Sequence, residues 1–240
     1  MAEKLKGAIL AAGSGERLRS SAGDLPKPLV EINGEPMLFR QIRAINEVGA
    51  SPIHVIINSE TRRLMREHRL ESSSPVDWLV RDTENSMESL LHLGECIGSG
   101  HFLLATVDAV LPKREMARFV TYATKAAFNV AAELDGVIGV VRCESDSRPL
   151  YAHLGAEGMI VSLGGSEASL MTAGIYLFDT AIFAYADDAH RRGLSAMRQF
   201  LAMLVEGGER FAAFELSTAI DVDDGGSLAA ARAMLAREPE

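Results

Sequence analysis

A glycine-rich stretch near the start of the chain is followed by two cationic side chains, a combination suited to binding phosphate groups. Gly13 and Gly15 come soon after a short apolar run, and Arg17 and Lys27 follow them. Glycine lets the backbone approach a ligand and direct N–H groups at phosphate oxygens, arginine offers a fork of donors, and lysine supplies a point charge. We therefore predict a polyphosphate site formed by Leu10, Ala11, Ala12, Gly13, Ser14, Gly15, Arg17 and Lys27.

Two common kinds of phosphate loop do not fit this stretch. The spacing Gly13-x-Gly15-x-x-Leu18 lacks the third glycine of a dinucleotide-binding fingerprint, and no Gly-Lys-Ser/Thr follows to form a Walker loop. A tight strand-to-helix turn with two solvated cations is the alternative. Two further motifs, Pro26-Lys27-Pro28-Leu29 and Asn33-Gly34-Glu35-Pro36-Met37, favour the phosphate site over that turn.

Carboxylates form the second group of candidate residues. Asp108 follows an apolar run, so we expect it near the carboxyl end of a parallel strand, where open α/β sheets bind ligands. Asp221, Asp223 and Asp224 place three carboxylates within four residues, which is costly unless they are well solvated or bind a cation. The alternatives are a capping or solvated Asp108 and an acidic loop in which Asp224 or Ser227 caps the last helix.

The elements that must position these residues alternate between extended and helical patterns. Strands are expected at 6–10, 53–58, 76–80 and 102–106, and helices at 37–48, 61–68, 87–97 and 115–125. Alternation predicts parallel strands joined by crossover helices. Beyond Gly136, strands are expected at 137–142, 159–163, 170–178 and 211–216, and helices at 181–189, 194–205 and 227–236. We expect a single α/β domain over residues 1–240, with a mixed, mostly parallel sheet and helices on both faces.

Composition and charge exclude several classes of protein. The chain has 240 residues, of which 48% are hydrophobic and 24% charged, so we expect a folded globular protein. Its longest stretch without Asp, Glu, Lys or Arg, Cys96 to Val107, is too short for a membrane helix. The net charge of −9 disfavours nucleic acid as a partner. The first residues lack the features of a signal peptide, so a cytoplasmic protein is expected.

Five motifs in order resemble the nucleotidyltransferases that make nucleoside-diphosphate sugars and related activated alcohols. The motifs are residues 10–18, residues 26–29 with 34–37, residues 102–104 leading to Asp108, residues 172–178, and residues 221–224 with Leu228. This resemblance implies a Rossmann-like sheet. Its N-terminal half, about residues 1–135, would hold a nucleoside triphosphate, and its C-terminal half, about residues 136–240, a phosphorylated acceptor, with Mg²⁺ between them.

The resemblance also implies roles for the charged residues. Asp108 and Asp223, with Asp221 beside the latter, would hold Mg²⁺, which prefers oxygen ligands and commonly takes one or two carboxylates plus substrate phosphate. An acceptor phosphate oxygen would attack the α-phosphorus of the triphosphate in line, without a protein nucleophile. Arg17 would hold the leaving phosphates, and Lys27 would contact oxygens on which negative charge grows.

The residues that bind the base and the acceptor are predicted less directly from the sequence. In the polar segment that leads into the third predicted helix, Asn85, Ser86 and Ser89 could offer amide or hydroxyl groups to the base, although Ser86 is also a suitable helix N-cap. CTP or UTP is favoured, with CTP preferred by resemblance. Thr172 and Gly174 resemble the acceptor-side strand of the family, and an ordinary core strand is the alternative.

The acceptor class follows from a missing motif. Many sugar-1-phosphate members recognise their acceptor through a Glu-Lys-Pro segment, whereas Val161-Ser162-Leu163-Gly164-Gly165 stands here. The acceptor is therefore expected to be a small monophosphate: a sugar-1-phosphate, an inositol phosphate or phosphocholine. A molybdenum-cofactor nucleotidyltransferase and a non-catalytic nucleotide sensor are the rival interpretations, and a homo-oligomer is compatible with the sequence.

Overall fold

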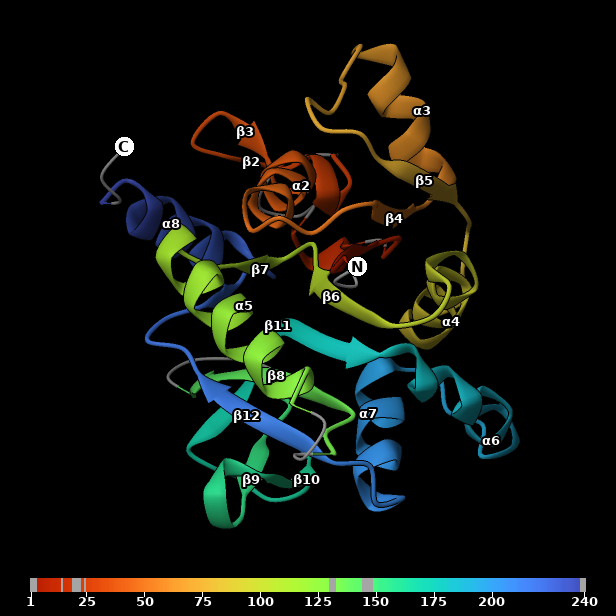
Figure 1. The fold of residues 1–240 in the computed structure, drawn as a ribbon. Helices are drawn as coiled ribbons and strands as arrows, with labels where there is room; N and C mark the ends of the chain where they lie inside the picture. Colours follow the sequence, from red (N-terminus) through yellow and green to blue (C-terminus); the bar gives the residue numbers. More distant parts are fainter. Residues whose placement is uncertain are drawn as a thin grey trace.

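A seven-stranded mixed sheet forms the centre of the protein (Figure 1). The computed structural model describes residues 4–13, 15–18, 23, 25–129, 133–143 and 149–237. The strands follow the order β12 (Phe211–Glu215), β8 (Gly136–Arg142), β11 (Leu170–Asp179), β6 (His101–Thr106), β1 (Lys6–Ala11), β4 (Ile53–Ile57) and β5 (Asp77–Val80). Strand β11 is antiparallel to β6 and β8, and the other pairs in this sheet are parallel. The prediction of a mostly parallel α/β sheet is confirmed.

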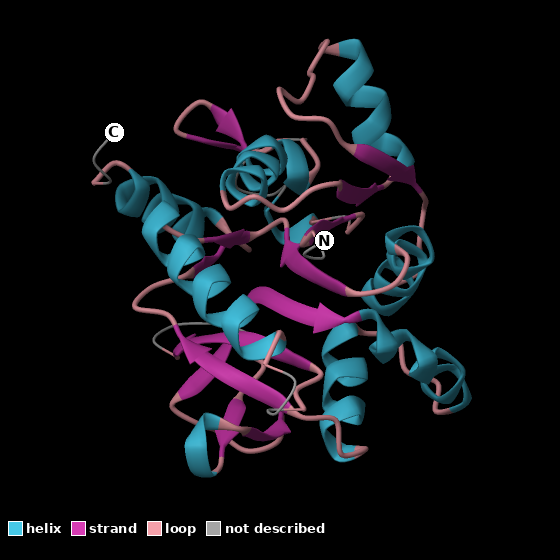
Figure 2. Cartoon of the chain, viewed as in Figure 1, coloured by secondary structure: helices cyan, strands magenta, loops and turns pink. Residues whose placement is uncertain are grey.

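Helices cover both faces of this sheet, as expected. Within the part of the chain that the structure describes, the α-helices include α2 (Met37–Glu47), α3 (Ser59–Glu67), α4 (Ser86–Ile97), α5 (Lys113–Ala127), α6 (Ala186–Arg191), α7 (Met197–Glu206) and α8 (Gly225–Leu235). Buried side chains of α2, α5 and α8 belong to one hydrophobic cluster, and those of α4 and α7 belong to a second. Figure 2 shows the two groups of helices with the strands between them.

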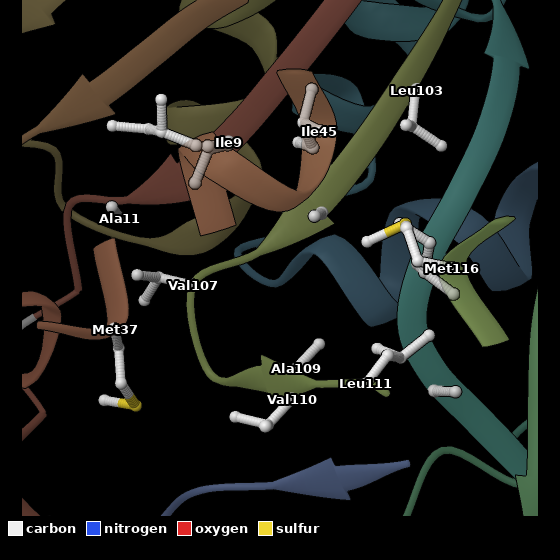
Figure 3. Packing of buried hydrophobic residues seen from close by; sticks show 14 of the residues in the cluster. Ile9, Ala11, Met37, Ile45, Leu103, Val107, Ala109, Val110, Leu111 and Met116 are labelled. Carbon is white, nitrogen blue, oxygen red and sulfur yellow. The ribbon is translucent and has the colours of Figure 1, made fainter. Parts of the chain in front are cut away.

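Alternation along β1 explains how one strand serves both clusters. Ile9 and Ala11 pack in the first cluster, whereas Ala8 and Leu10 pack in the second. Successive side chains of a strand point to opposite faces, so an entirely apolar strand is needed between two layers of helices. Figure 3 shows Ile9 and Ala11 among the side chains of the first cluster.

Short ladders complete the fold. Strands β2 (Glu31–Ile32) and β3 (Glu35–Pro36) form a hairpin that leads into α2, and β9 (Ala152–Leu154) pairs with β10 (Ile160–Leu163). Strand β7 (Ala109–Val110), which follows β6 closely, pairs with β13 (Ile220–Asp221) near the other end of the chain. This last ladder brings together the two acidic segments singled out in the sequence.

Strand β10, expected at 159–163, pairs with β9 in a separate two-stranded sheet. One expected element differs in kind from the prediction. The helix expected at 181–189 is a 3₁₀ turn, η4 (Thr180–Tyr185), followed by α6. The Asp179 carboxylate accepts a hydrogen bond from the Ala181 amide, which starts the tight turn one residue early. Within the described part of the chain, no helix is both long and apolar enough to cross a membrane.

Candidate active site

A cavity of about 970 Å³ opens where β1, β4 and β6 end at their carboxyl termini. It is lined by most of the residues singled out in the sequence: Leu10, Ala12, Gly13, Gly15, Arg17, Lys27, Asn85, Ser86, Ser89, Asp108, Thr172, Gly174, Asp221 and Asp223. Ala11 does not line it, because alternation along β1 buries that side chain in the opposite hydrophobic cluster. Ser14 lies outside the described residues.

The glycine-rich loop packs directly against the lysine. Gly15 has φ +63°, and a Cβ atom there would lie 2.3 Å from the Cβ atom of Lys27. Any other residue would be strained at this φ and would collide with the lysine. Asn58, at the end of β4, donates from Nδ2 to the carbonyl oxygen of Ala12 at 3.2 Å and accepts from the Thr61 amide with Oδ1. One side chain therefore both caps α3 and ties it to the loop.

Lys27 joins two acidic residues from distant parts of the chain. Its Nζ atom lies 2.5 Å from Oδ2 of Asp108 and 2.6 Å from Oδ1 of Asp223. Arg17 approaches the other oxygen of Asp223, with Nη2 2.6 Å from Oδ2. The residue Lys27 is only 8% exposed. Short, largely desolvated pairs of this kind hold charges in fixed positions.

The surroundings keep these groups charged. Burial alone would lower the pKa of Lys27, but the charges of Asp108 and Asp221 and the hydrogen bonds with Asp108 and Asp223 raise it above its ordinary value. Burial alone would raise the pKa of Asp108, but the Lys27 ammonium and a hydrogen bond with the Thr106 side chain lower it. At neutral pH the site therefore contains a lysine cation and an aspartate anion.

Three carboxylates converge beside Lys27. Asp108, Asp221 and Asp223 each offer one oxygen, and these oxygens lie within 4.8 Å of one another. The backbone arranges them: Asp221 pairs with Ala109 in the β13–β7 ladder, and the Val222 amide donates to the carbonyl oxygen of Asp108 at 3.1 Å. Several carboxylate oxygens around one point fit a hard divalent cation such as Mg²⁺.

The fourth aspartate has a structural role. Oδ1 of Asp224 accepts from the Ser227 amide at 2.8 Å, so Asp224 is the N-cap of α8. The Ser227 hydroxyl in turn accepts from the Asp224 amide, completing a capping box. The expectation that Asp224 or Ser227 caps the last helix is confirmed, and this anchoring fixes the backbone that carries Asp223.

The three polar residues expected near the base lie together at the start of α4. Asn85, not Ser86, is the N-cap, because Oδ1 of Asn85 accepts from the Glu88 amide. The Ser86 hydroxyl accepts from the Met197 amide of α7, and the Ser89 hydroxyl pairs with that of Thr83 at 2.6 Å. All three line the cavity, but much of their hydrogen-bonding capacity stabilises the loop itself.

On the opposite side of the cavity, a bulge in β11 shapes the wall. The register of β11 against β8 shifts between Thr172 and Tyr176, and Gly174 within it has φ +71°. A Cβ atom on Gly174 would lie 2.6 Å from the Cβ atom of Ala109 and from Oγ1 of Thr106. Close packing of β11 against the end of β6 thus explains the glycine. Burial raises the pKa of Tyr176 to about 12, so its hydroxyl stays protonated.

Sequence reasoning missed several lining residues. On the loop side these are Glu16, Asn58, Asp82, Thr83 and Glu84, and on the β11 side they include Leu150, Met171, Tyr176, Met197, Arg198 and Leu201. Asn58 could have been found, because it directly follows a predicted parallel strand, where ligands bind. Arg198 carries no such signal, since an arginine in an amphipathic helix is an ordinary surface residue.

Comparison with known proteins identifies the family. A family model described as a MobA-like NTP transferase domain matches residues 7–159. The chain belongs to this family. The expected resemblance to nucleotidyltransferases is confirmed, since relatives of this family member include sugar-phosphate nucleotidyltransferases.

Relatives of this chain act on different bases and acceptors, by their names. It is 27% identical to a mannose-1-phosphate guanyltransferase of Pichia angusta, over 84% of this chain and 56% of that protein. It is 30% identical to a 2-aminoethylphosphonate cytidylyltransferase of Lancefieldella rimae, over 46% of this chain and 45% of that protein. The chain therefore spans about half the length of the curated relatives it matches.

A solved structure shows the same fold over nearly the whole chain. The inositol-1-phosphate CTP transferase from T. maritima superposes with a TM-score of 0.80 at 16% identity, covering 99% of this chain and 98% of that one. This likeness shows that the two proteins share one fold over nearly their whole lengths.

Proposed function

We propose that the protein is a divalent-metal-dependent nucleotidyltransferase that transfers a nucleoside monophosphate from a nucleoside triphosphate to a small phosphorylated acceptor. The observation that carries this proposal is the cluster of Lys27, Asp108 and Asp223 at the centre of a cavity bordered by a glycine-rich loop and by β11. Cations and carboxylates in one place suit a reaction between two anions that need charge neutralisation.

The proposed reaction gives each charged group a task. An oxygen of the acceptor phosphate forms a bond to the α-phosphorus, the bond from that phosphorus to the bridging oxygen breaks, and pyrophosphate leaves with the electron pair. Arg17 binds the leaving phosphates, and Lys27 exchanges a carboxylate partner for a phosphate oxygen. Asp108, Asp223 and Asp221 hold Mg²⁺, which neutralises phosphate charge when bound.

The substrates follow from the two sides of the cavity. Asn85, Ser86 and Ser89 face the base, and the Asn85 cap uses only Oδ1, which leaves Nδ2 to donate to a ligand. A pyrimidine offers few groups to read, which favours CTP or UTP, and CTP by resemblance. Thr172 and Gly174 face the acceptor, with Arg198 as a cation for its phosphate. The acceptor is a sugar-1-phosphate, an inositol phosphate or phosphocholine.

Pyrophosphate release tests this function. The purified protein is incubated with CTP, UTP, GTP or ATP, with each acceptor in turn, and with Mg²⁺ or chelator, and products are weighed by mass spectrometry. We expect a nucleoside-diphosphate conjugate that requires both acceptor and Mg²⁺. Undiminished turnover in chelator would contradict the metal site. Turnover with GTP or ATP alone would contradict the proposed preference for a pyrimidine nucleotide. Nucleotide binding without turnover would identify a non-catalytic sensor.

The family description supports one second candidate. Because the matching family is MobA-like, molybdopterin belongs in the acceptor panel, and turnover with it alone would assign a molybdenum-cofactor nucleotidyltransferase. A homo-oligomer stays a prediction, which size-exclusion chromatography with light scattering tests. The cytoplasmic location also stays a prediction, which fractionation of the source cells tests.

A further inference from the structure

Gln41 is a buried polar residue that does not line the cavity. It lies on α2, where the other buried side chains are all apolar, and it is only 5% exposed. A buried amide is costly unless its hydrogen bonds are satisfied. A leucine or methionine would fill the same position on this helix face without that cost, so packing alone does not explain a glutamine.

Its amide connects the two ends of the turn that carries Asp108. The Nε2 atom donates to the carbonyl oxygen of Thr106 at 3.1 Å and to that of Ala109 at 3.2 Å. Thr106 is the last residue of β6 and Ala109 the first of β7, with Asp108 between them. Both N–H bonds of one rigid amide are thus used to fix the two ends of a short turn.

Two other contacts hold the same turn from different directions. Gly174 of β11 packs closely against Thr106 and Ala109, and the Val222 amide binds the carbonyl oxygen of Asp108. Gln41 supplies the contact from the α2 side. Groups that orient a metal-binding side chain without touching the metal commonly change metal affinity when they are replaced.

We propose that Gln41 is a positioning residue, which tethers Thr106 and Ala109 and thereby holds the Asp108 carboxylate ready for a divalent cation and for Lys27. The proposal rests on the proposed function for its metal. It extends that function to a side chain that lies outside the cavity and outside the motifs singled out in the sequence.

The test measures metal binding apart from turnover. Mn²⁺ binding to the purified protein is followed by electron paramagnetic resonance for wild type, Gln41→Met and the control Leu38→Met, a fully buried apolar neighbour on the same helix. We expect Gln41→Met to weaken Mn²⁺ binding about tenfold or more and to lower kcat with little change in the KM for nucleotide. The control should keep wild-type Mn²⁺ affinity.

The outcomes separate this proposal from the function on which it rests. If the wild-type protein neither binds Mn²⁺ nor catalyses turnover, that result would contradict the proposed function itself. If Gln41→Met folds, binds Mn²⁺ with wild-type affinity and differs only in a lower melting temperature, the positioning role is overturned. If Gln41→Met does not fold, Gln41→His, which keeps one N–H donor, is measured instead: an Mn²⁺ affinity below that of wild type supports the proposal, and an unchanged affinity contradicts it.

Discussion

The ammonium group of Lys27 lies 2.5 Å from Oδ2 of Asp108, a residue that also belongs to the candidate metal cluster. In this state the lysine provides positive charge to carboxylates that a divalent cation would otherwise neutralise. Lys27 can therefore be released toward phosphate when a cation binds, without leaving the aspartates uncompensated.

The first prediction concerns Lys27→Ala. Removing a buried partner leaves Asp108 without its lysine and Asp223 with Arg17 alone, so we expect the melting temperature in chelator to fall and Mg²⁺ to restore part of the loss. We also expect kcat to fall about a hundredfold, and more than nucleotide affinity, because the charge acts on oxygens that become more negative in the transition state. Thermal melts with and without Mg²⁺, and steady-state kinetics, measure both effects. An unchanged kcat with a raised KM would show that Lys27 only binds nucleotide.

The second prediction contrasts two adjacent aspartates. Asp223→Asn keeps the size of the side chain but removes the charge facing Lys27 and Arg17, so turnover should fall about a hundredfold or more. Asp224→Asn keeps an N-cap of α8, because asparagine caps helices as well as aspartate, so activity should stay near that of wild type. Pyrophosphate release at saturating Mg²⁺ compares them, and equal losses would contradict the assignment of Asp223.

The sheet and its carboxyl edge could be predicted because their signals are local. Apolar runs alternating with helical patterns indicate a parallel sheet, and a carboxylate directly after such a run indicates its carboxyl edge. The family resemblance, rather than a local pattern, implied that Asp108 and Asp223 lie together, and the structure places both beside Lys27. The strand at 159–163 was predicted but its partner β9 was not, because the pattern of one short strand does not specify its partner.

Other parts of the site depend on contacts that no local pattern contains. Gln41 reads as a polar residue of an amphipathic helix, and only the tertiary structure shows that it faces inward. Ser86 and Asn85 are both good caps, and the choice between them depends on Met197 of α7, which takes the Ser86 hydroxyl as its acceptor. Contacts between segments this far apart are set by packing rather than by propensity.

The third prediction compares two glycines with positive φ. Gly174→Ala would be strained and would also collide with Ala109 and Thr106, so it should lower the free energy of unfolding by about 1–3 kcal/mol and slow turnover by displacing Asp108. Gly165 has φ +77°, but a Cβ atom there would have no atom within 4 Å. Gly165→Ala should therefore show only the smaller cost of backbone strain. Urea unfolding and pyrophosphate release measure both, and equal effects would contradict the packing argument.

The last prediction is a pH dependence of stability carried by His54. Burial is the largest cause that lowers the pKa of His54, and Lys6 lowers it further, whereas Asp77, with Oδ2 3.6 Å from Nδ1, raises it. The net direction is below the ordinary value of 6.5. The unfolded chain therefore binds a proton that the folded protein rejects, so this contribution to stability is complete above pH 6.5 and is lost below it, as the pH falls toward the lower pKa of the folded state.

Urea unfolding between pH 5 and pH 8 measures this dependence. His54→Gln should unfold with a shallower loss of stability below about pH 6.5 than wild type, because the titrating group is gone. His92→Gln, at a histidine that is 39% exposed on α4, is the control substitution. If the free energy of unfolding of His54→Gln falls with pH as steeply as that of wild type, the prediction is contradicted, because the pH dependence then arises from groups other than this buried imidazole.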